Sequence, residues 1–320
     1  MRLNQIYSNR NYETWPSWDL VFEWENIFKE KFKIPFAYFN FFLLKMGDRI
    51  LFLNRIFIRK NILVHEMGAR SKNHFFNNKK VIPYIIDYHI SKNEVSNFEK
   101  AYCKNPIVLV SSFEAYKYLT TKKCKLKIYH LALSISDKYR ISPQTNFKKE
   151  YDLVLMGRQN PVLEKYLAEY IEKNPSFRYV YRKQIGTQFL YFTSDGEAIG
   201  DINTREKYID LMRKSKVGLY SASGIDLDEK KTKGFNQVTP RFLELVACGC
   251  HILARYKKNP DTEYYCLEKF SRNIDTYDNF EEDLNSKLNS NVDMEDYAQY
   301  LESHYTSKRA NKLEEILNNL

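Results

Sequence analysis

The segment from Val238 to Leu253 constrains the fold of this chain more than any other. It reads Val-Thr-Pro-Arg-Phe-Leu-Glu-Leu-Val-Ala-Cys-Gly-Cys-His-Ile-Leu. Thr239 suits the cap of a helix, Pro240 its first helical position, and Gly249 its exit. The apolar residues that follow predict a buried strand. A helix that starts in this way presents free backbone N–H groups and the positive end of its dipole, which together favour an anion such as phosphate.

Glu244 lies about one turn inside this helix, where its carboxylate can accept hydrogen bonds from the hydroxyl groups of a sugar. An anion site beside a hydroxyl acceptor indicates a nucleotide. The same spacing also suits an ordinary capped helix with a solvated Glu244, so spacing alone leaves both interpretations open.

The pattern Pro-Arg-x-x-Glu-x-x-x-Cys-Gly, followed by an apolar strand, resembles the donor-binding helix of GT-B glycosyltransferases. The resemblance is to the branch that holds the "group 1" and spore-maturation-type enzymes. In that family a glutamate at the place of Glu244 binds the ribose of a nucleotide-sugar, and the amides before it hold the diphosphate. The resemblance extends from Leu3 to about Phe280 and implies an α/β fold of two doubly wound, Rossmann-like domains that face a cleft. The residues that carry the resemblance most specifically lie in the second half of the chain.

Strands and helices alternate along both halves of the chain, which favours parallel α/β organisation. We expect strands at 3–8, 34–39, 61–68, 81–90, 107–112, 127–132, 151–156, 177–182, 217–220 and 251–254. We expect helices at 19–32, 41–57, from 113, 161–172 and 205–214, and in the tail from 294. The polar stretch 142–150 looks like a linker. The predicted domains are an acceptor-side domain (1–146), a nucleotide-sugar-binding domain (147–295) and a helical tail (296–320), for which packing back on the first domain is one arrangement.

Composition fits a folded two-domain protein: 320 residues, 43% hydrophobic and 15% aromatic. The net charge of +10 favours sugar nucleotides, anionic lipid headgroups or nucleic acid without choosing among them. The five cysteines show no metal spacing and are interpreted as reduced thiols. With no signal peptide and no apolar run of about 18 residues, we expect a cytoplasmic protein, and a peripheral contact with the inner face of the membrane stays open.

Ligands of doubly wound sheets bind beyond the carboxyl ends of the strands. In the second half this rule selects Gly157, Arg158, Ser221 and Ser223, and the helix start adds Val238, Thr239, Pro240, Arg241 and Glu244. Asn236, just before that start, completes the candidate donor-binding residues. Arg158 and Arg241 could neutralise a diphosphate, with a surface salt bridge or a solvated helix position as the alternatives. Because these cations and the helix start can neutralise phosphate, we expect no metal or other cofactor, and the nucleotide-sugar is a co-substrate.

In the first half the same rule selects His65, Glu66 and Asp87 as candidate catalytic residues, with His89 beside them. Transfer to a hydroxyl group is helped by a base that removes its proton. If the reaction inverts, one of these groups is the base, and His65 is favoured. If it retains, they position the acceptor.

Retaining members of the family often carry a second glutamate about eight residues before the one that resembles Glu244. Here Asn236 holds that place, or Lys233 if the spacing is shifted. Neither is a carboxylate, so the stereochemistry stays open. The charged run 226–233 before it is most simply a solvated loop.

The stretch 41–60 mixes aromatic residues with Lys45, Arg49, Arg55, Arg59 and Lys60. Such a helix could rest on anionic lipid, although a core helix with solvated charges is the plainer alternative. Motifs of P-loop enzymes, zincins, α/β-hydrolases and glycine-rich dinucleotide sites do not occur.

The sequence therefore predicts a metal-independent glycosyltransferase. It would move a sugar from a nucleotide-sugar to a hydroxyl of a saccharide or lipid-linked acceptor, in bacterial surface glycan or lipopolysaccharide synthesis. The alternatives are a sugar-nucleotide epimerase of the same fold and a non-enzymatic protein that stacks single-stranded nucleic acid on aromatic side chains. The charges are spread along the chain, and Glu244 has no use in a nucleic-acid module, so we expect no nucleic-acid partner.

Overall fold

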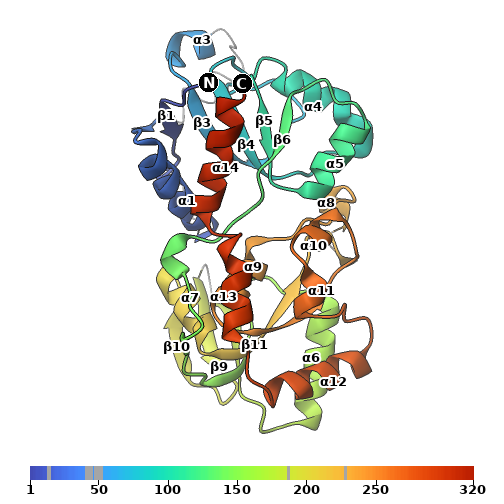
Figure 1. Ribbon diagram of the computed structural model, residues 1–320. Helices are drawn as coiled ribbons and strands as arrows, with labels where there is room; N and C mark the ends of the chain where they lie inside the picture. The colour runs from blue at the N-terminus through green and yellow to red at the C-terminus, as the bar shows by residue number, and fades with distance from the viewer. Residues whose placement is uncertain (13–15, 40–45, 47–52, 186–187, 227–228) are drawn as a thin grey trace. The chain divides into compact units, whose positions relative to one another are not determined.

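The computed structural model describes residues 1–12, 16–39, 46, 53–185, 188–226 and 229–320 (Figure 1). The chain forms two compact units. The first comprises Met1–Asp137, Glu229–Gln237 and His304–Leu320, and the second Lys138–Asp228 and Val238–Ser303. Each unit is an α/β domain with its own sheet, as the sequence predicts.

The first unit contains, in its described part, a six-stranded parallel sheet with the strand order β2-β1-β3-β4-β5-β6. Its strands are β1 (Gln5–Tyr7), β2 (Phe36–Ala37), β3 (Ile62–Gly68), β4 (Val81–Asp87), β5 (Val108–Val110) and β6 (Ile128–His130). β3, β4 and β5 are buried along almost their whole length because both faces of a parallel sheet are covered by helices.

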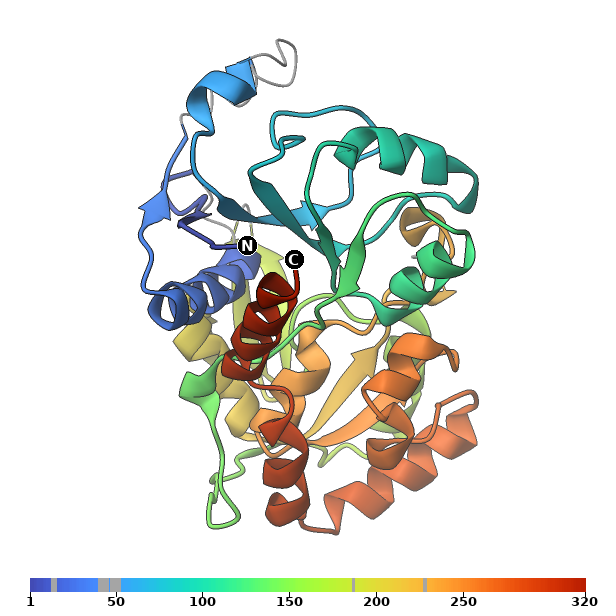
Figure 2. The same cartoon turned by 45° about the horizontal axis from the view of Figure 1, so that its top comes forward.

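Helices cover the two faces of this first sheet. One face packs against α1 (Pro16–Phe32) and α14 (Thr306–Asn318), which bring Trp24, Phe28 and Leu313 onto Leu63 and Tyr84. The other face packs against α4 (Val95–Tyr102) and α5 (Phe113–Thr121). The last helix of the chain therefore belongs to the first unit, and the N-terminal amine donates a hydrogen bond to a carbonyl near the end of α14, so the two termini lie side by side (Figure 2).

The first unit also holds a segment from the second half of the chain. Glu229–Gln237, which the sequence analysis placed in the second domain, includes the short helix α8 (Glu229–Thr232) and packs onto the first sheet. Phe235 is fully buried there, with its ring 5.1 Å from that of Tyr88 and 5.5 Å from that of Tyr118. Burial of this aromatic side chain explains why the segment leaves its sequence neighbours.

The second unit has, in its described residues, a six-stranded sheet of order β10-β9-β8-β7-β11-β12. Its strands are β7 (Tyr151–Val154), β8 (Tyr179–Ile185), β9 (Gln188–Thr193), β10 (Ala198–Asp201), β11 (Ser215–Ser221) and β12 (His251–Arg255). β7, β8, β11 and β12 are parallel, whereas β9 and β10 form an antiparallel extension that the sequence analysis missed. The signal for it was the Asp195-Gly196 turn between two apolar stretches, with Gly196 at a φ of +91°.

Helices pack around this second sheet. They are α6 (Pro161–Lys173), α7 (Arg205–Arg213), α9 (Pro240–Ala247), α10 (Pro260–Tyr264), α11 (Leu267–Phe270), α12 (Tyr277–Leu288) and α13 (Met294–Glu302). Leu163 and Leu167 of α6 meet Phe280 and Leu284 of α12 over the strands. The predicted linker 142–150 contains no helix or strand.

Of the helix expected at 41–57, the described residues are Met46 and α3 (Leu53–Phe57), and the rest, including Lys45 and Arg49, lies outside the described part. Among the described helices, none combines the length and the apolar character that a membrane span requires.

Candidate functional site

The order of strands in the second unit marks a ligand site. The chain leaves β7 for β8 on one side and later returns to β11 on the other side, so the winding reverses between β7 and β11. Ligands of such sheets bind in the crevice beyond the carboxyl ends of the two strands at this reversal. Gly157 and Arg158 follow β7, while Ser221 ends β11 and Ser223 follows it. The structure thus brings these predicted donor residues to one edge of one sheet.

The turn after β7 is tied to the start of α9. Gly157 has a φ of +63°, and a Cβ at this position would lie 2.3 Å from Nη2 of Arg241. Arg241 Nη1 donates a hydrogen bond of 2.8 Å to the carbonyl oxygen of Arg158. A glycine is therefore required both by the backbone conformation and by the approach of the guanidinium.

The start of α9 has the properties expected of an anion site. Thr239 occupies the cap position, but its side chain does not bond the first turn, and its N–H donates to the hydroxyl of Tyr220 at 3.0 Å. The first turn also contains no acidic residue. The positive end of the helix dipole is therefore not neutralised by its own side chains. Val238 is buried and Pro240 is partly exposed at this start.

Glu244 is not a solvated residue. Its side chain lies in the interior and accepts a hydrogen bond of 2.7 Å from Nη2 of Arg205, which is also buried. Arg205 was not among the residues predicted from the sequence. The available signal was an arginine in the first turn of α7, where a cation meets the positive end of a helix dipole and needs a compensating partner.

Two arginines surround this single carboxylate. Burial alone would lower the pKa of Arg241, but the nearby Tyr208 and Glu244 outweigh it and raise that pKa. Burial, with the Glu244 charge, raises the pKa of Tyr208 to about 12. Arg241 therefore brings a positive charge to the helix start, next to the pair formed by Arg205 and Glu244, and this charge suits a diphosphate.

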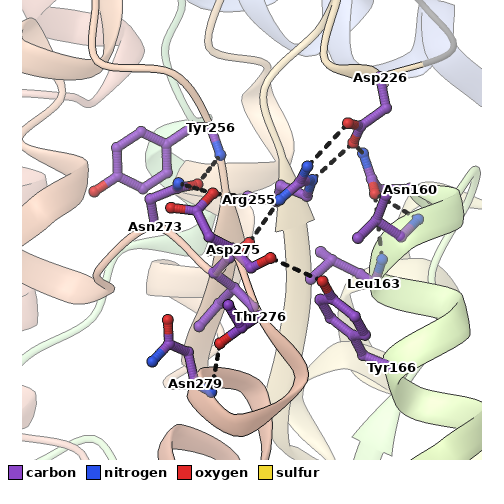
Figure 3. Close-up of polar contacts among 12 residues, drawn as sticks. Asn160, Leu163, Tyr166, Asp226, Arg255, Tyr256, Asn273, Asp275, Thr276 and Asn279 are labelled. Carbon is purple, nitrogen blue, oxygen red and sulfur yellow. Dashed lines mark hydrogen bonds and ion pairs between the residues drawn. The ribbon is translucent and has the colours of Figure 1, made fainter.

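A second polar network holds the loop after β11 (Figure 3). Asp226, at a φ of +58°, accepts two hydrogen bonds from Arg255 at the end of β12, at 2.8 and 3.0 Å. Asn160 donates to Asp226 at 2.7 Å and caps α6 through its other side-chain atom. The interpretation of 226–233 as a solvated loop is therefore wrong at Asp226, which ties three elements together.

His65 and Glu66 do not form one site. β3 continues to Gly68, so both residues lie within the paired strand, and neighbouring residues of a strand point to opposite faces. His65 faces α1, between the rings of Phe28 and Tyr84, with Nδ1 3.8 Å from Oε1 of Glu25. Burial lowers its pKa to about 3, so the ring is neutral at pH 7.

Glu66 faces α4 on the other side of the sheet. The hydroxyl of Tyr102 donates a hydrogen bond to it, and Nδ1 of His74 lies 3.7 Å away. Asp87, by contrast, ends β4 at the carboxyl edge and is only partly buried. Burial raises its pKa, while the charge of His89 opposes this shift.

Sequence reasoning missed a group of residues at the reversal point of the first sheet, between β1 and β3. Ser8 donates a hydrogen bond of 2.6 Å to Glu25, and Arg10 lies 3.3 Å from the same carboxylate. Burial raises the pKa of Glu25 to about 7, although Ser8 and Arg10 act in the opposite direction. A carboxyl group that titrates near neutrality is a candidate acid or base. The sequence signal for this group was the position of Glu25 between the apolar residues Trp24 and Phe28 of the same helix, which indicates that its carboxyl group is buried with them.

Asn236 belongs to the first unit, unlike the other predicted donor residues. Its N–H donates to Glu114 at 2.8 Å. The adjacent Gln237 donates to the carbonyl of Ile86 at 2.8 Å and to the hydroxyl of Ser111 at 2.7 Å. The segment that leads into α9 is thus anchored on β4 and β5.

No protein-family model matches this chain, and no curated protein matches it either. Solved structures do. The lipopolysaccharide outer core galactosyltransferase WaaB, in its apo form, has a TM-score of 0.53 at 12% identity over 100% of both chains. A putative UDP-N-acetylglucosamine 2-epimerase from Listeria monocytogenes has a TM-score of 0.53 at 12% identity over 98% of this chain and 94% of its own.

The pneumococcal O-GlcNAc transferase GtfA, in complex with UDP and GlcNAc, has a TM-score of 0.51 at 10% identity. This match covers 84% of the present chain but 59% of that transferase, so the chain spans about three fifths of its length. The chain therefore has the GT-B fold, which its glycosyltransferase and epimerase neighbours share.

Proposed function

We propose that this chain is a glycosyltransferase that moves a sugar from a nucleotide-sugar donor to a hydroxyl group of a saccharide or lipid-linked acceptor. The observation that carries the proposal is the arrangement at the β7/β11 reversal point. There a glycine turn, Arg241 and an uncompensated helix start meet, and Glu244 lies one turn further along α9. The GT-B fold supports the same conclusion.

In this proposal the second unit binds the donor. The diphosphate approaches the backbone at Gly157 and contacts the start of α9 and Arg241. These fixed positive groups stabilise the negative charge that develops on the diphosphate as the sugar leaves. They can do so without a divalent metal. Glu244, oriented by Arg205, would accept hydrogen bonds from the hydroxyl groups of the ribose.

The first unit would present the acceptor. Of the three predicted catalytic residues, Asp87 lies at the carboxyl edge of the sheet, and its raised pKa suits a group that accepts a proton. His65 and Glu66 lie deeper, within β3, and we assign them to the support of that edge. WaaB, by its name, acts in lipopolysaccharide synthesis, and we place this enzyme in bacterial surface glycan synthesis at the cytoplasmic face of the membrane.

A sugar-nucleotide epimerase is the second candidate, because the Listeria epimerase matches nearly the whole chain at the same TM-score as WaaB. The two activities differ in what happens to the donor alone. An epimerase converts the sugar of the donor without an acceptor, whereas a transferase requires an acceptor to release nucleoside diphosphate stoichiometrically. Incubation of the donor alone, followed by analysis of its sugar, separates them.

The first experiment is a thermal-shift panel with UDP, GDP, CMP, ADP, dTDP and a short oligonucleotide. A ligand that binds the folded state raises the melting temperature. We expect one nucleoside diphosphate to stabilise the protein. Arg241→Gln should lower the apparent affinity for it, obtained from the shift as a function of nucleotide concentration, at least about tenfold, a typical loss for a charged contact. The exposed Arg178 of the same unit offers the control Arg178→Gln. A protein that responds to none of the nucleotides would refute the proposal.

A further inference from the structure

Basic residues occupy the loops that enter four strands of the first sheet, β3, β4, β5 and β6. Because these strands are parallel, their starts lie at one edge, opposite the edge where ligands bind. Arg59-Lys60 precedes β3, Lys79-Lys80 precedes β4, Lys104 precedes β5, and the run Lys122–Lys127 precedes β6. No aspartate or glutamate occurs in 59–61, 78–80, 103–107 or 122–127. We call the surface formed by these loops the amino edge.

The cations of the amino edge are available to a partner. Arg59, Lys60, Lys79 and Lys104 are exposed, as are the four lysines of the run 122–127. Within the described part of the chain, none of them forms an ion pair. Glu99 of α4 approaches the run 122–127, but it accepts a hydrogen bond of 2.7 Å from the backbone N–H of Lys125 and not from a lysine side chain. Arg59 instead donates a hydrogen bond of 3.0 Å from Nε to the carbonyl oxygen of Ile56, which leaves its charge uncompensated.

Large apolar side chains lie next to these cations. Ile56 and Phe57 end α3 just before Arg59, and each is 46% exposed. Asn54 of the same helix is buried and holds it in place: its side-chain N–H donates to the carbonyl oxygen of Asn77 at 3.1 Å, and Asn78 donates to its carbonyl oxygen at 3.1 Å. Figure 2 shows α3 standing out from the sheet of the first unit. The exposed pair is therefore presented by a helix that is anchored to the sheet.

We infer that the amino edge docks on an anionic membrane. Exposed lysines and arginines attract anionic lipid headgroups, and a bulky apolar pair beside them can enter the boundary between headgroups and acyl chains. A strand the length of β3 separates the two edges by about 20 Å, so docking leaves the ligand edge free. The inference depends on the fold and not on the proposed transfer reaction.

The membrane explains the surface better than nucleic acid does. Single-stranded nucleic acid binds grooves in which aromatic rings alternate with cations. The rings nearest these cations, Tyr118 and Tyr129, lie 5.9 Å from Lys122 and Lys127 and are partly buried. The exposed apolar side chains are instead an isoleucine and a phenylalanine at the end of one helix. Ile56 has no ring on which a base could stack, whereas both side chains suit insertion among lipids.

The test is co-sedimentation with vesicles of phosphatidylcholine alone and of an equal mixture with phosphatidylglycerol. We expect the full chain to sediment with the mixed vesicles and to dissociate as salt is raised. Each cation near such a surface strengthens binding about fivefold. Replacing four of them should therefore lower the partition coefficient at least about tenfold. This variant is Lys122→Gln, Lys123→Gln, Lys125→Gln and Lys127→Gln together.

A control variant removes the same charge from the second unit. It replaces the exposed lysines Lys148, Lys165, Lys173 and Lys258 by glutamine and should bind mixed vesicles like the unaltered protein. A further variant, Ile56→Ser with Phe57→Ser, keeps every charge and should also weaken binding. Thermal melting of each variant verifies that it is folded.

An equal loss in the control variant would show that net charge alone acts and would overturn the inference. So would full binding by the amino-edge variant. If the serine variant binds normally and an oligonucleotide strips the protein from vesicles, the surface serves nucleic acid instead. Nucleotide response is measured separately without vesicles, so a failure here leaves the proposed transfer reaction standing, and the reverse holds.

Discussion

The pair formed by Arg205 and Glu244 permits a quantitative test of the donor site. The two side chains are 9% and 5% exposed and 2.7 Å apart, so water screens them little. Removing one partner of a buried ion pair typically costs 3–5 kcal/mol, since the other charge stays buried and unpaired. For Glu244→Gln we expect a loss of about 3 kcal/mol, at the lower end of that range. Arg205→Met should cost less, because Arg241 still faces the carboxylate.

Thermal unfolding measures these changes. For a unit of this size, 1 kcal/mol lowers the melting temperature by roughly 2–4 °C, so Glu244→Gln should lower it by about 6–12 °C. The double variant should be less destabilised than the sum of the two single variants by about 2 kcal/mol, as expected for residues in direct contact. The exposed pair Glu169 and Lys173 provides the control, and Glu169→Gln should cost less than about 0.5 kcal/mol.

Nucleotide binding by the same variants separates two roles of Glu244. If its carboxylate contacts the ribose, the double variant recovers part of the stability lost in the single variants but still binds nucleoside diphosphate weakly. If Glu244 only balances the charge of Arg205, the double variant recovers stability and nucleotide affinity together. Additive losses of stability in the double variant would refute the claim that the two side chains act as a buried pair.

Two further predictions concern other sites. Gly157→Ala would place a methyl group against the Arg241 guanidinium, at a residue with a positive φ. We therefore expect the nucleotide affinity measured by calorimetry to fall at least about tenfold. The control Gly196→Ala also has a positive φ but open space around the new methyl group, and it should leave the affinity unchanged. Burial, and then the Arg309 charge, lowers the pKa of His304 from 6.5 to about 3. The folded state therefore favours the neutral ring. The contribution of His304 to the free energy of unfolding is fully present above pH 6.5 and is lost as the pH falls toward 3, by about 2 kcal/mol at pH 5. His304→Gln should remove that part of the pH dependence in denaturant titrations, and an unchanged slope would contradict it.

Local patterns were sufficient to predict most strands and helices. Apolar runs bounded by turn residues identified β3, β4 and β12, and the Thr-Pro start with the Gly exit identified α9, because periodicity and capping act within a few residues. They were also sufficient to predict that the candidate donor residues at the ends of β7 and β11 lie at one edge of the sheet, since the carboxyl-end rule needs only strand order and direction.

Tertiary structure alone decided which side chains meet. His65 and Glu66 are adjacent in the sequence but lie on opposite faces of β3, whereas Arg205 and Glu244 are far apart in the sequence and form an ion pair. Partners of this kind depend on the packing of separate elements, which no local pattern encodes. The lysines and arginines before the strands look scattered along the chain, but parallel strands start at one edge, and the fold therefore gathers them on one surface.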